Sequence, residues 1–195
     1  MGSTRSFALA ALICVAPLTA HAGASAAWTA AKANLPKATT VVVGLDLAQL
    51  TKSSLFSLAF PLIMAQQPDV KAGLELIKST CQLDPLKVVN GIVVGTDDEQ
   101  KHGAIYIAVE GVDQAKIVSC FEAVGKAKGK DGKVGIKTEG KITELSFGDK
   151  QIYLSWIGTN VIVLPLEFTN KADLAAWSGA TSGAKGLAKD RKSVV

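Results

Sequence analysis

The feature that most restricts the fold is a change in the spacing of the apolar residues after Pro85. Apolar side chains recur at helical spacing in residues 53–66 and 68–81, and from residue 89 onward they alternate with polar ones, as in strands. One helical segment, 113–125, interrupts this alternation. The strands expected from this pattern are 89–96, 102–111, 133–138, 141–147, 151–157 and 161–164.

Two further segments complete the expected order of elements. TTVVVGLDL, residues 39–47, combines β-branched side chains with a glycine break and predicts a buried strand ahead of the helices. Residues 171–177 predict a last short helix. The order indicates an α+β fold, in which an antiparallel sheet has helices packed on one face and a C-terminal β-meander.

The N-terminus has the parts of a secretory signal peptide. Arg5 supplies a basic start, residues 7–15 form an apolar run, and Ala20-His21-Ala22 presents the small side chains that signal peptidase requires. The run is shorter than the roughly 20 residues of a membrane-spanning helix. We expect cleavage after Ala22 or, as a second choice, after Ala26, and no transmembrane segment after cleavage. The protein would then be periplasmic or secreted; the alternative is an uncleaved N-terminal anchor.

The part of the chain after the expected signal peptide has the length of a typical single domain. Residues 1–22 are the expected signal peptide, and residues 23–38 are Ala-rich and expected to be a loose segment with Trp28 as an anchor. Residues 39–178 are expected to form a single α+β domain. Residues 179–195 are expected to be a flexible basic tail.

Two cysteines, Cys81 and Cys120, remain once the signal peptide with Cys14 is removed. Each lies on the apolar stripe of its expected helix, since Cys81 follows Ile77 and Cys120 follows Ile117 at helical spacing. An even number of cysteines in an exported chain predicts a disulfide. Closing this loop would stabilise the fold by about 4 kcal/mol in the chain-entropy model. The alternative is two separate buried thiols.

The segment Cys81-Gln82-Leu83-Asp84-Pro85 at the end of a helix, followed by a strand pair and then by Cys120 in the next helix, resembles an uncharacterised group of exported bacterial proteins. The resemblance covers residues 39–165. It implies export and the disulfide. Members of the group generally have no assigned activity, so the resemblance implies no site residues.

GIKTEGKI, residues 135–142, spells most of a phosphate-binding loop, with Gly135, Gly140 and Lys141 in the expected places. Ile142 stands where a hydroxyl would hold magnesium. A phosphate loop must also enter a helix, whereas residues 141–147 alternate as a strand. We therefore interpret Glu139-Gly140 as the turn of a hairpin and expect no nucleotide site.

His102 is the one histidine outside the signal peptide. It could join Asp97, Asp98 and a serine in a hydrolase triad, but no Gly-x-Ser-x-Gly segment is present, so we expect a solvated turn. Asp97, Asp98 and Glu99 lack the spacing of a calcium loop, and one histidine with two disulfide-prone cysteines does not make a zinc site. We predict no catalytic residue, no cofactor and no metal.

The formal net charge of +4 is concentrated in two segments expected to be flexible, residues 126–133 and the C-terminal tail. Basic loops attract nucleic acid and anionic surfaces. No aromatic residue is interleaved with these lysines to stack on bases, so we expect no nucleic-acid partner.

LFSLAFPLIMA, residues 55–65, is the most apolar stretch after the leader. We interpret it as a core helix, with a lid over an apolar ligand site as the alternative. The leading functional prediction is a non-enzymatic exported protein of a bacterial envelope that binds an unknown protein or an apolar ligand. The alternative is a secreted enzyme or enzyme inhibitor whose site is assembled from scattered residues.

Overall fold

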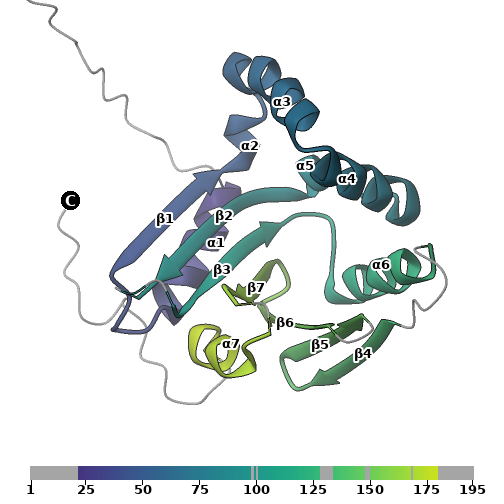
Figure 1. The fold of residues 1–195 in the computed structure, drawn as a ribbon. Helices are drawn as coiled ribbons and strands as arrows, with labels where there is room; N and C mark the ends of the chain where they lie inside the picture. The colour runs from purple at the N-terminus through teal and green to yellow at the C-terminus, as the bar shows by residue number, and fades with distance from the viewer. Residues whose placement is uncertain are drawn as a thin grey trace, which may run out of the picture.

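One antiparallel sheet runs through the described part of the chain, in the strand order β1-β2-β3-β7-β6-β5-β4 (Figure 1). The structure is a computed structural model that describes residues 22–97, 99, 101–127, 134–147, 150–167 and 169–179. The strands are β1 (Val41–Asp46), β2 (Val89–Thr96), β3 (Gly103–Val109), β4 (Val134–Glu139), β5 (Ile142–Phe147), β6 (Lys150–Ile157) and β7 (Val161–Pro165). The helices are α1 (Ala22–Asn34), α2 (Leu47–Leu50), α3 (Ser54–Gln66), α4 (Pro68–Cys81), α5 (Pro85–Val88), α6 (Gln114–Ala127) and α7 (Lys171–Trp177). The α+β class, the antiparallel sheet and the C-terminal meander are confirmed.

Two long connections set the topology. Helices α2 to α5 lie between β1 and β2, although these two strands are neighbours in the sheet. Helix α6 carries the chain from β3, in the middle of the sheet, to β4 at its far edge. The meander β4-β5-β6-β7 then returns, and β7 pairs with β3. Residues 104–108 are thereby joined to residues 161–165.

The expectation of a loose segment over residues 23–38 is wrong, because most of it is helix α1. Ala27, Ala30 and Ala31 of this helix are buried in the core between the helix and the sheet. The helix lies behind β1, β2 and β3 in the view of Figure 1. Alanine has the highest helix propensity, and its small side chain lets a helix approach a sheet closely. The Trp28 ring packs over Gly44 of β1 so closely that a Cβ there would lie 2.6 Å from it. Trp28 is thus an anchor, as expected, but of a helix.

The two faces of the sheet have separate cores. On one face α1 and α7 cover Val93, Tyr106 and Val163, and the Tyr106 hydroxyl donates a hydrogen bond to the carbonyl of Trp177. On the other face α4 and α6 lie over Leu145, Leu154, Trp156 and Ile162. The helices expected on one face, α4 and α6, do share a face. Helices α1 and α7 cover the opposite face, so the expectation of helices on one face only is wrong. Most of α1 belongs to residues 23–38, which were expected to lie outside the domain.

Local signals in the sequence account for several element ends. The Ser53 side chain accepts a hydrogen bond from Phe56 N–H and caps α3, and Pro68 occupies the first turn of α4. Helix α3 continues through Pro61. Helix α4 ends at Cys81, with Gln82 in the left-handed region, and the Asp84 side chain then accepts a hydrogen bond from Leu86 N–H and caps α5.

The segment that resembles a phosphate loop is a β-hairpin. Glu139 pairs with Ile142 across the β4–β5 ladder, so the turn consists of Gly140 and Lys141, one residue later than expected. Gly140 has φ +61°, a conformation that glycine adopts without strain. Residues 142–147 continue as strand β5, so the segment lacks the helix that a phosphate site needs.

Candidate ligand-binding face

Apolar side chains form two rows across the sheet on the face opposite α1. One row consists of Val43, Val94, Ile105 and Leu164, which lie opposite one another on β1, β2, β3 and β7. The second row consists of Leu45, Ile92, Ile107, Ile162 and Trp156 and continues onto β6. Because neighbouring strands lie about 4.8 Å apart, the three steps from β1 to β7 span roughly 14 Å. Both rows consist of apolar side chains only.

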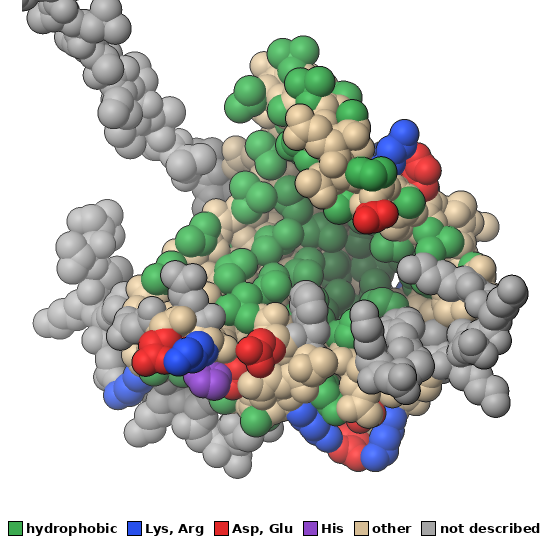
Figure 2. Space-filling view, in the orientation of Figure 1, with side chains coloured by type: hydrophobic (Ala, Val, Ile, Leu, Met, Phe, Trp, Pro, Cys, Tyr) green, Lys and Arg blue, Asp and Glu red, His purple; other side chains and the backbone are tan. Residues whose placement is uncertain are grey.

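Exposure changes steadily along these rows. Ile162 and Trp156 are 8% and 6% exposed beneath the α4–α6 side of the fold, whereas Val43 and Leu45 are 63% and 45% exposed. Val41, two residues before Val43 and on the same face, is also exposed. In Figure 2 the hydrophobic side chains over β1, β2 and β3 form one continuous surface, which is hollowed below α4. We give the name open face to the exposed Val41, Val43 and Leu45 together with the half-buried Ile92 and Val94 beside them.

The expectation that residues 39–47 form a buried strand is therefore wrong in respect of burial. Strand β1 is present, but it lies at the end of the sheet and only its α1-side face is covered among the described residues. Val42 packs against the α1 core, while its neighbours Val41 and Val43 point the other way. A strand that is apolar on both faces needs two covers, and the described part of the chain supplies one.

Helix α3 is the second exposed apolar element, and the expectation that it packs in the core is wrong. Leu58 is 73% exposed, Leu55, Leu62 and Ile63 are at least half exposed, and no residue of α3 is buried. Figure 1 shows α3 projecting from the body of the fold above β2. Phe56 and Phe60 stack on each other, with 4.8 Å between ring centroids. A helix that is apolar all round is normally buried, so the exposed side chains of α3 form a candidate binding surface.

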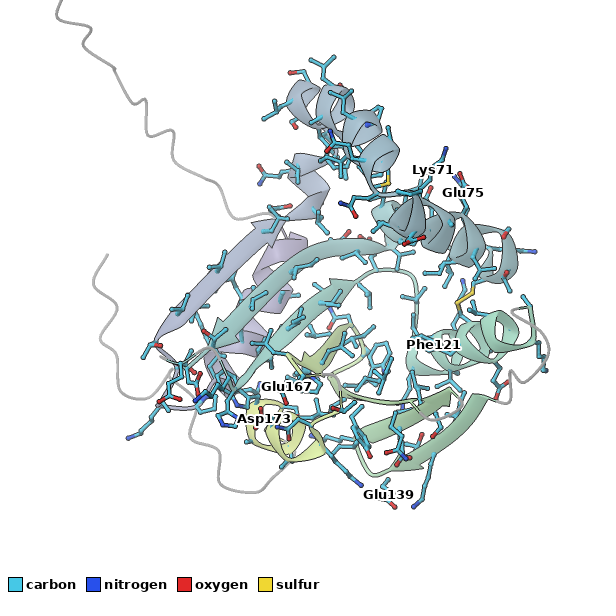
Figure 3. The ribbon with its side chains drawn as sticks, viewed as in Figure 1. Lys71, Glu75, Phe121, Glu139, Glu167 and Asp173 are labelled. Carbon is cyan, nitrogen blue, oxygen red and sulfur yellow. A yellow bond between two sulfur atoms is a disulfide. The ribbon has the colours of Figure 1, made fainter. Side chains whose placement is uncertain are left out.

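A small cavity of about 230 Å³ lies where α3, α4 and α5 meet. Phe60, Met64 and Leu74 contribute apolar surface to it. At its rim Lys71 pairs with Glu75, both labelled in Figure 3, at an Nζ–Oε1 distance of 3.9 Å. Lys78 pairs with Asp84 at 3.3 Å. These exposed ion pairs balance one another, so the cavity has no net charge to attract an ion.

The predicted disulfide between Cys81 and Cys120 is present in the structure. Their sulfur atoms are 1.93 Å apart and their Cα atoms 5.0 Å apart, and the bond joins α4 to α6, as Figure 3 shows. Phe121, labelled next to it on α6, is partly buried in the core below. The two helical stripes therefore meet on one face of the sheet, as their spacing predicted. The disulfide holds the α4–α6 cover in place beside the open face.

His102 lies in the turn before β3 with its side chain more than half exposed, as expected. Its Nδ1 atom is 3.0 Å from a carboxylate oxygen of Asp173 in α7, a pairing that the sequence analysis missed. The hydrogen bond and charge of Asp173 raise the pKa of His102 above 6.5, and Asp97 and Glu167 add to this effect. Figure 3 labels Asp173, in α7, and Glu167, which precedes this helix in the chain. The pair ties α7 to the β2–β3 turn.

The acidic turn does not form a cation site in the part that the structure describes. One carboxylate oxygen of Asp97 accepts hydrogen bonds from the backbone N–H groups of Lys101 and His102, while Glu99 pairs with the Lys101 ammonium. Asp98 lies outside the described residues. Within the described ranges, no group of three or more histidine, cysteine, aspartate or glutamate side chains is placed to hold a metal.

Several expectations concern residues that the structure does not describe. The expected signal peptide up to residue 21, most of the basic loop (residues 128–133) and the tail from residue 180 lie outside the described ranges. Among the helices that the structure describes, none has both the length and the apolar character to cross a membrane.

We compared the chain with protein-family models, with curated proteins and with solved structures, and none of the three comparisons finds a match. The candidate site therefore depends on the geometry described above.

Proposed function

We propose that this protein is an exported, non-enzymatic binding protein that holds an apolar ligand on the open face. The observation that carries the proposal is the exposure of Val41, Val43 and Leu45 at the end of rows that are buried elsewhere in the sheet. Contiguous exposed apolar patches mark sites of interaction in proteins that are otherwise well packed. The rows contain no charged side chain, so the favoured ligand is held by apolar contact.

Helix α3 supports the same proposal. It lies between α2, which follows β1 directly, and α4, which the disulfide joins to α6. Its leucines Leu55, Leu58 and Leu62 are each more than 60% exposed and are available to close over a ligand. The lid considered in the sequence analysis is therefore the role that we propose for this helix.

The disulfide supports the proposed location outside the cytoplasm. Disulfides persist in oxidising compartments such as the periplasm and the extracellular space, and they are rare in reducing ones. The bond between Cys81 and Cys120, together with the leader-like N-terminus, fits a periplasmic or secreted protein of a bacterial envelope.

The test is a titration of the exported protein with a fluorescent long-chain fatty acid, followed by competition with unlabelled fatty acid. Leu45→Lys places a charge on the open face and should weaken binding at least tenfold. Val70→Lys is the matched control, because Val70 is a comparably exposed apolar residue on α4 and outside the two rows. Circular dichroism should show both variants folded, since neither residue is buried.

Equal affinity in wild type and Leu45→Lys would contradict the open face as the site. Equal loss in both lysine variants would show that binding is not specific to this face. Native mass spectrometry of protein purified from its own host, under conditions that retain bound lipids, should show an added mass that disappears in Leu45→Lys. Turnover of a substrate by the purified protein would instead favour the secreted enzyme considered in the sequence analysis.

A further inference from the structure

The two edges of the sheet differ in how they meet solvent. Edge strand β4 carries Lys137 and Glu139, which pair with each other at 2.7 Å, and Glu139 also pairs with Lys171 at 2.9 Å. Charged side chains of this kind protect an edge from pairing with another strand. Edge strand β1 reads Val-Val-Val-Gly-Leu before its one charged residue, Asp46, and it contains no proline. By these criteria β4 is protected and β1 is open.

Hydrogen bonding shows which backbone groups of β1 point outward. The N–H of Asp97 donates to the carbonyl of His102, so the odd-numbered residues of β2 direct their backbone groups to β3 and the even-numbered ones to β1. The odd-numbered residues of β1 lie opposite those even-numbered residues of β2. The even-numbered residues of β1, Val42, Gly44 and Asp46, therefore direct their N–H and C=O groups away from β2. No described strand pairs with them.

If β1 pairs antiparallel with β1 of a second copy of the chain, the outward-directed backbone groups of the two strands must form hydrogen bonds with one another. A pairing centred on Val43 places Val42 opposite Gly44 of the other copy, which satisfies both sets of backbone groups. Residues directly opposite in a ladder share a face, so Val41, Val43 and Leu45 of one copy lie beside Leu45, Val43 and Val41 of the other. The open faces of the two copies then become one continuous apolar surface.

The one charge of β1 favours the same arrangement. Asp46 ends the strand. A parallel pair in register would set Asp46 beside Asp46, whereas an antiparallel pair keeps the two carboxylates at opposite ends. In the arrangement centred on Val43, Asp46 lies opposite Thr40, and no like charges meet.

We propose that a second copy of this chain pairs antiparallel with the outer edge of β1, centred on Val43, and joins the two sheets across a two-fold axis. Such an interface is isologous, because the same strand is presented by both copies. The proposal does not depend on the ligand. It would place the two open faces side by side on one surface of the dimer.

The first test uses Val43→Cys in the exported full chain, where Cys81 and Cys120 are already paired. Opposite residues of a non-hydrogen-bonded antiparallel pair have Cα atoms about 4.5 Å apart, within the range of a disulfide. We expect a covalent dimer on a non-reducing gel after mild oxidation with copper phenanthroline, in which dissolved oxygen takes up the two electrons and two protons that the paired thiols lose. Val70→Cys, at an exposed position on α4, is the matched control and should remain a monomer.

The second test uses charge exchange at the two-fold axis. Val43→Lys and Val43→Asp should each be monomeric in native mass spectrometry, because like charges would face each other, while the wild type is dimeric. Mixing the two variants should restore a dimer that contains one copy of each. Circular dichroism verifies that both variants fold, as expected for an exposed position.

Two results would overturn the proposal. One is a wild-type protein that is monomeric at the highest concentration that stays in solution. The other is a dimer that survives both charge variants of Val43 and is lost in Leu58→Lys, which would assign the interface to α3. Fatty-acid binding by a strictly monomeric protein would reject the dimer and leave the proposed ligand face intact.

Discussion

The two faces of the sheet end differently at β1. On the face that carries Val42, α1 reaches the edge of the sheet, where the Trp28 ring lies against Gly44. On the other face α4 and α6 cover the strands from β3 to β4 and leave Val43 and Leu45 exposed. Val42 and Val43 are the same residue type on opposite faces of β1, yet Val42 packs against the α1 core and Val43 is exposed. Burial is therefore decided by which helix reaches the strand, and the uncovered face is the one available for binding.

The largest expected effect concerns the cover that stops short of β1. Replacing both cysteines, Cys81→Ala with Cys120→Ala, should lower the free energy of unfolding by about 4 kcal/mol, because the open chain gains conformational entropy when it unfolds. Urea unfolding followed by circular dichroism measures the change. Reduction of the wild-type protein should have a similar effect. An unchanged midpoint would mean that the packing of α4 and α6 does not need the bond.

A pair of leucine substitutions compares the two faces directly. Leu35 follows α1, is fully buried and lies over Gly95, so Leu35→Ala should cost about 3 kcal/mol of stability through lost burial and a cavity. Leu45→Ala on the open face should cost less than about 1 kcal/mol.

Both values come from the same urea titration, and the difference between them is the informative quantity. Equal costs would show that Leu45 is covered in solution, either by a second copy or by a retained ligand. Repeating the titration after delipidation and at several protein concentrations distinguishes these two covers, because only the dimer depends on concentration.

The smallest expected effect concerns how stability depends on pH through the His102–Asp173 pair, at the α7 end of the covered face. The pKa of His102 is raised in the folded state by Asp173, so the stability that the pair contributes is present below pH 6.5 and is lost as the pH rises through the folded-state pKa. The urea concentration at the unfolding midpoint of the wild type should therefore decrease as the pH is raised from 6 to 8. His102→Gln should remove this slope. A variant with the wild-type slope would assign the dependence to another group.

Elements with local signals could be predicted from the sequence. The Ser53 cap, Pro68 at the start of a helix and alternation within the meander each act over a few residues, so the bounds of α3, α4 and β5 were close to correct. The disulfide followed from two amphipathic stripes and an even number of cysteines. In each case the deciding interactions lie within the element or repeat along it.

What could not be predicted depends on contacts between distant residues. The amphipathic character of α1 is weak because it is mostly alanine, and its docking surface is supplied by Gly44 and Gly95, which lie further along the chain. His102 and Asp173 are 71 residues apart. The exposure of β1 required knowledge of its place at the end of the sheet. A signal for the open face was present in the Val-Val-Val run, since it is apolar on both faces and only one helix was available to cover it.

The pairing of β3 with β7 also has a consequence for the order of folding. As the chain is synthesised, β1, β2 and β3 are complete before residues 161–165 exist, so β3 is a temporary edge until β7 arrives. Pairing over such a separation is slow, because loop-closure entropy is lost before the contacts form. Pulse-labelling hydrogen exchange should therefore show the amides of the β2–β3 hairpin protected before those of β7. Early protection of β7 would contradict this order.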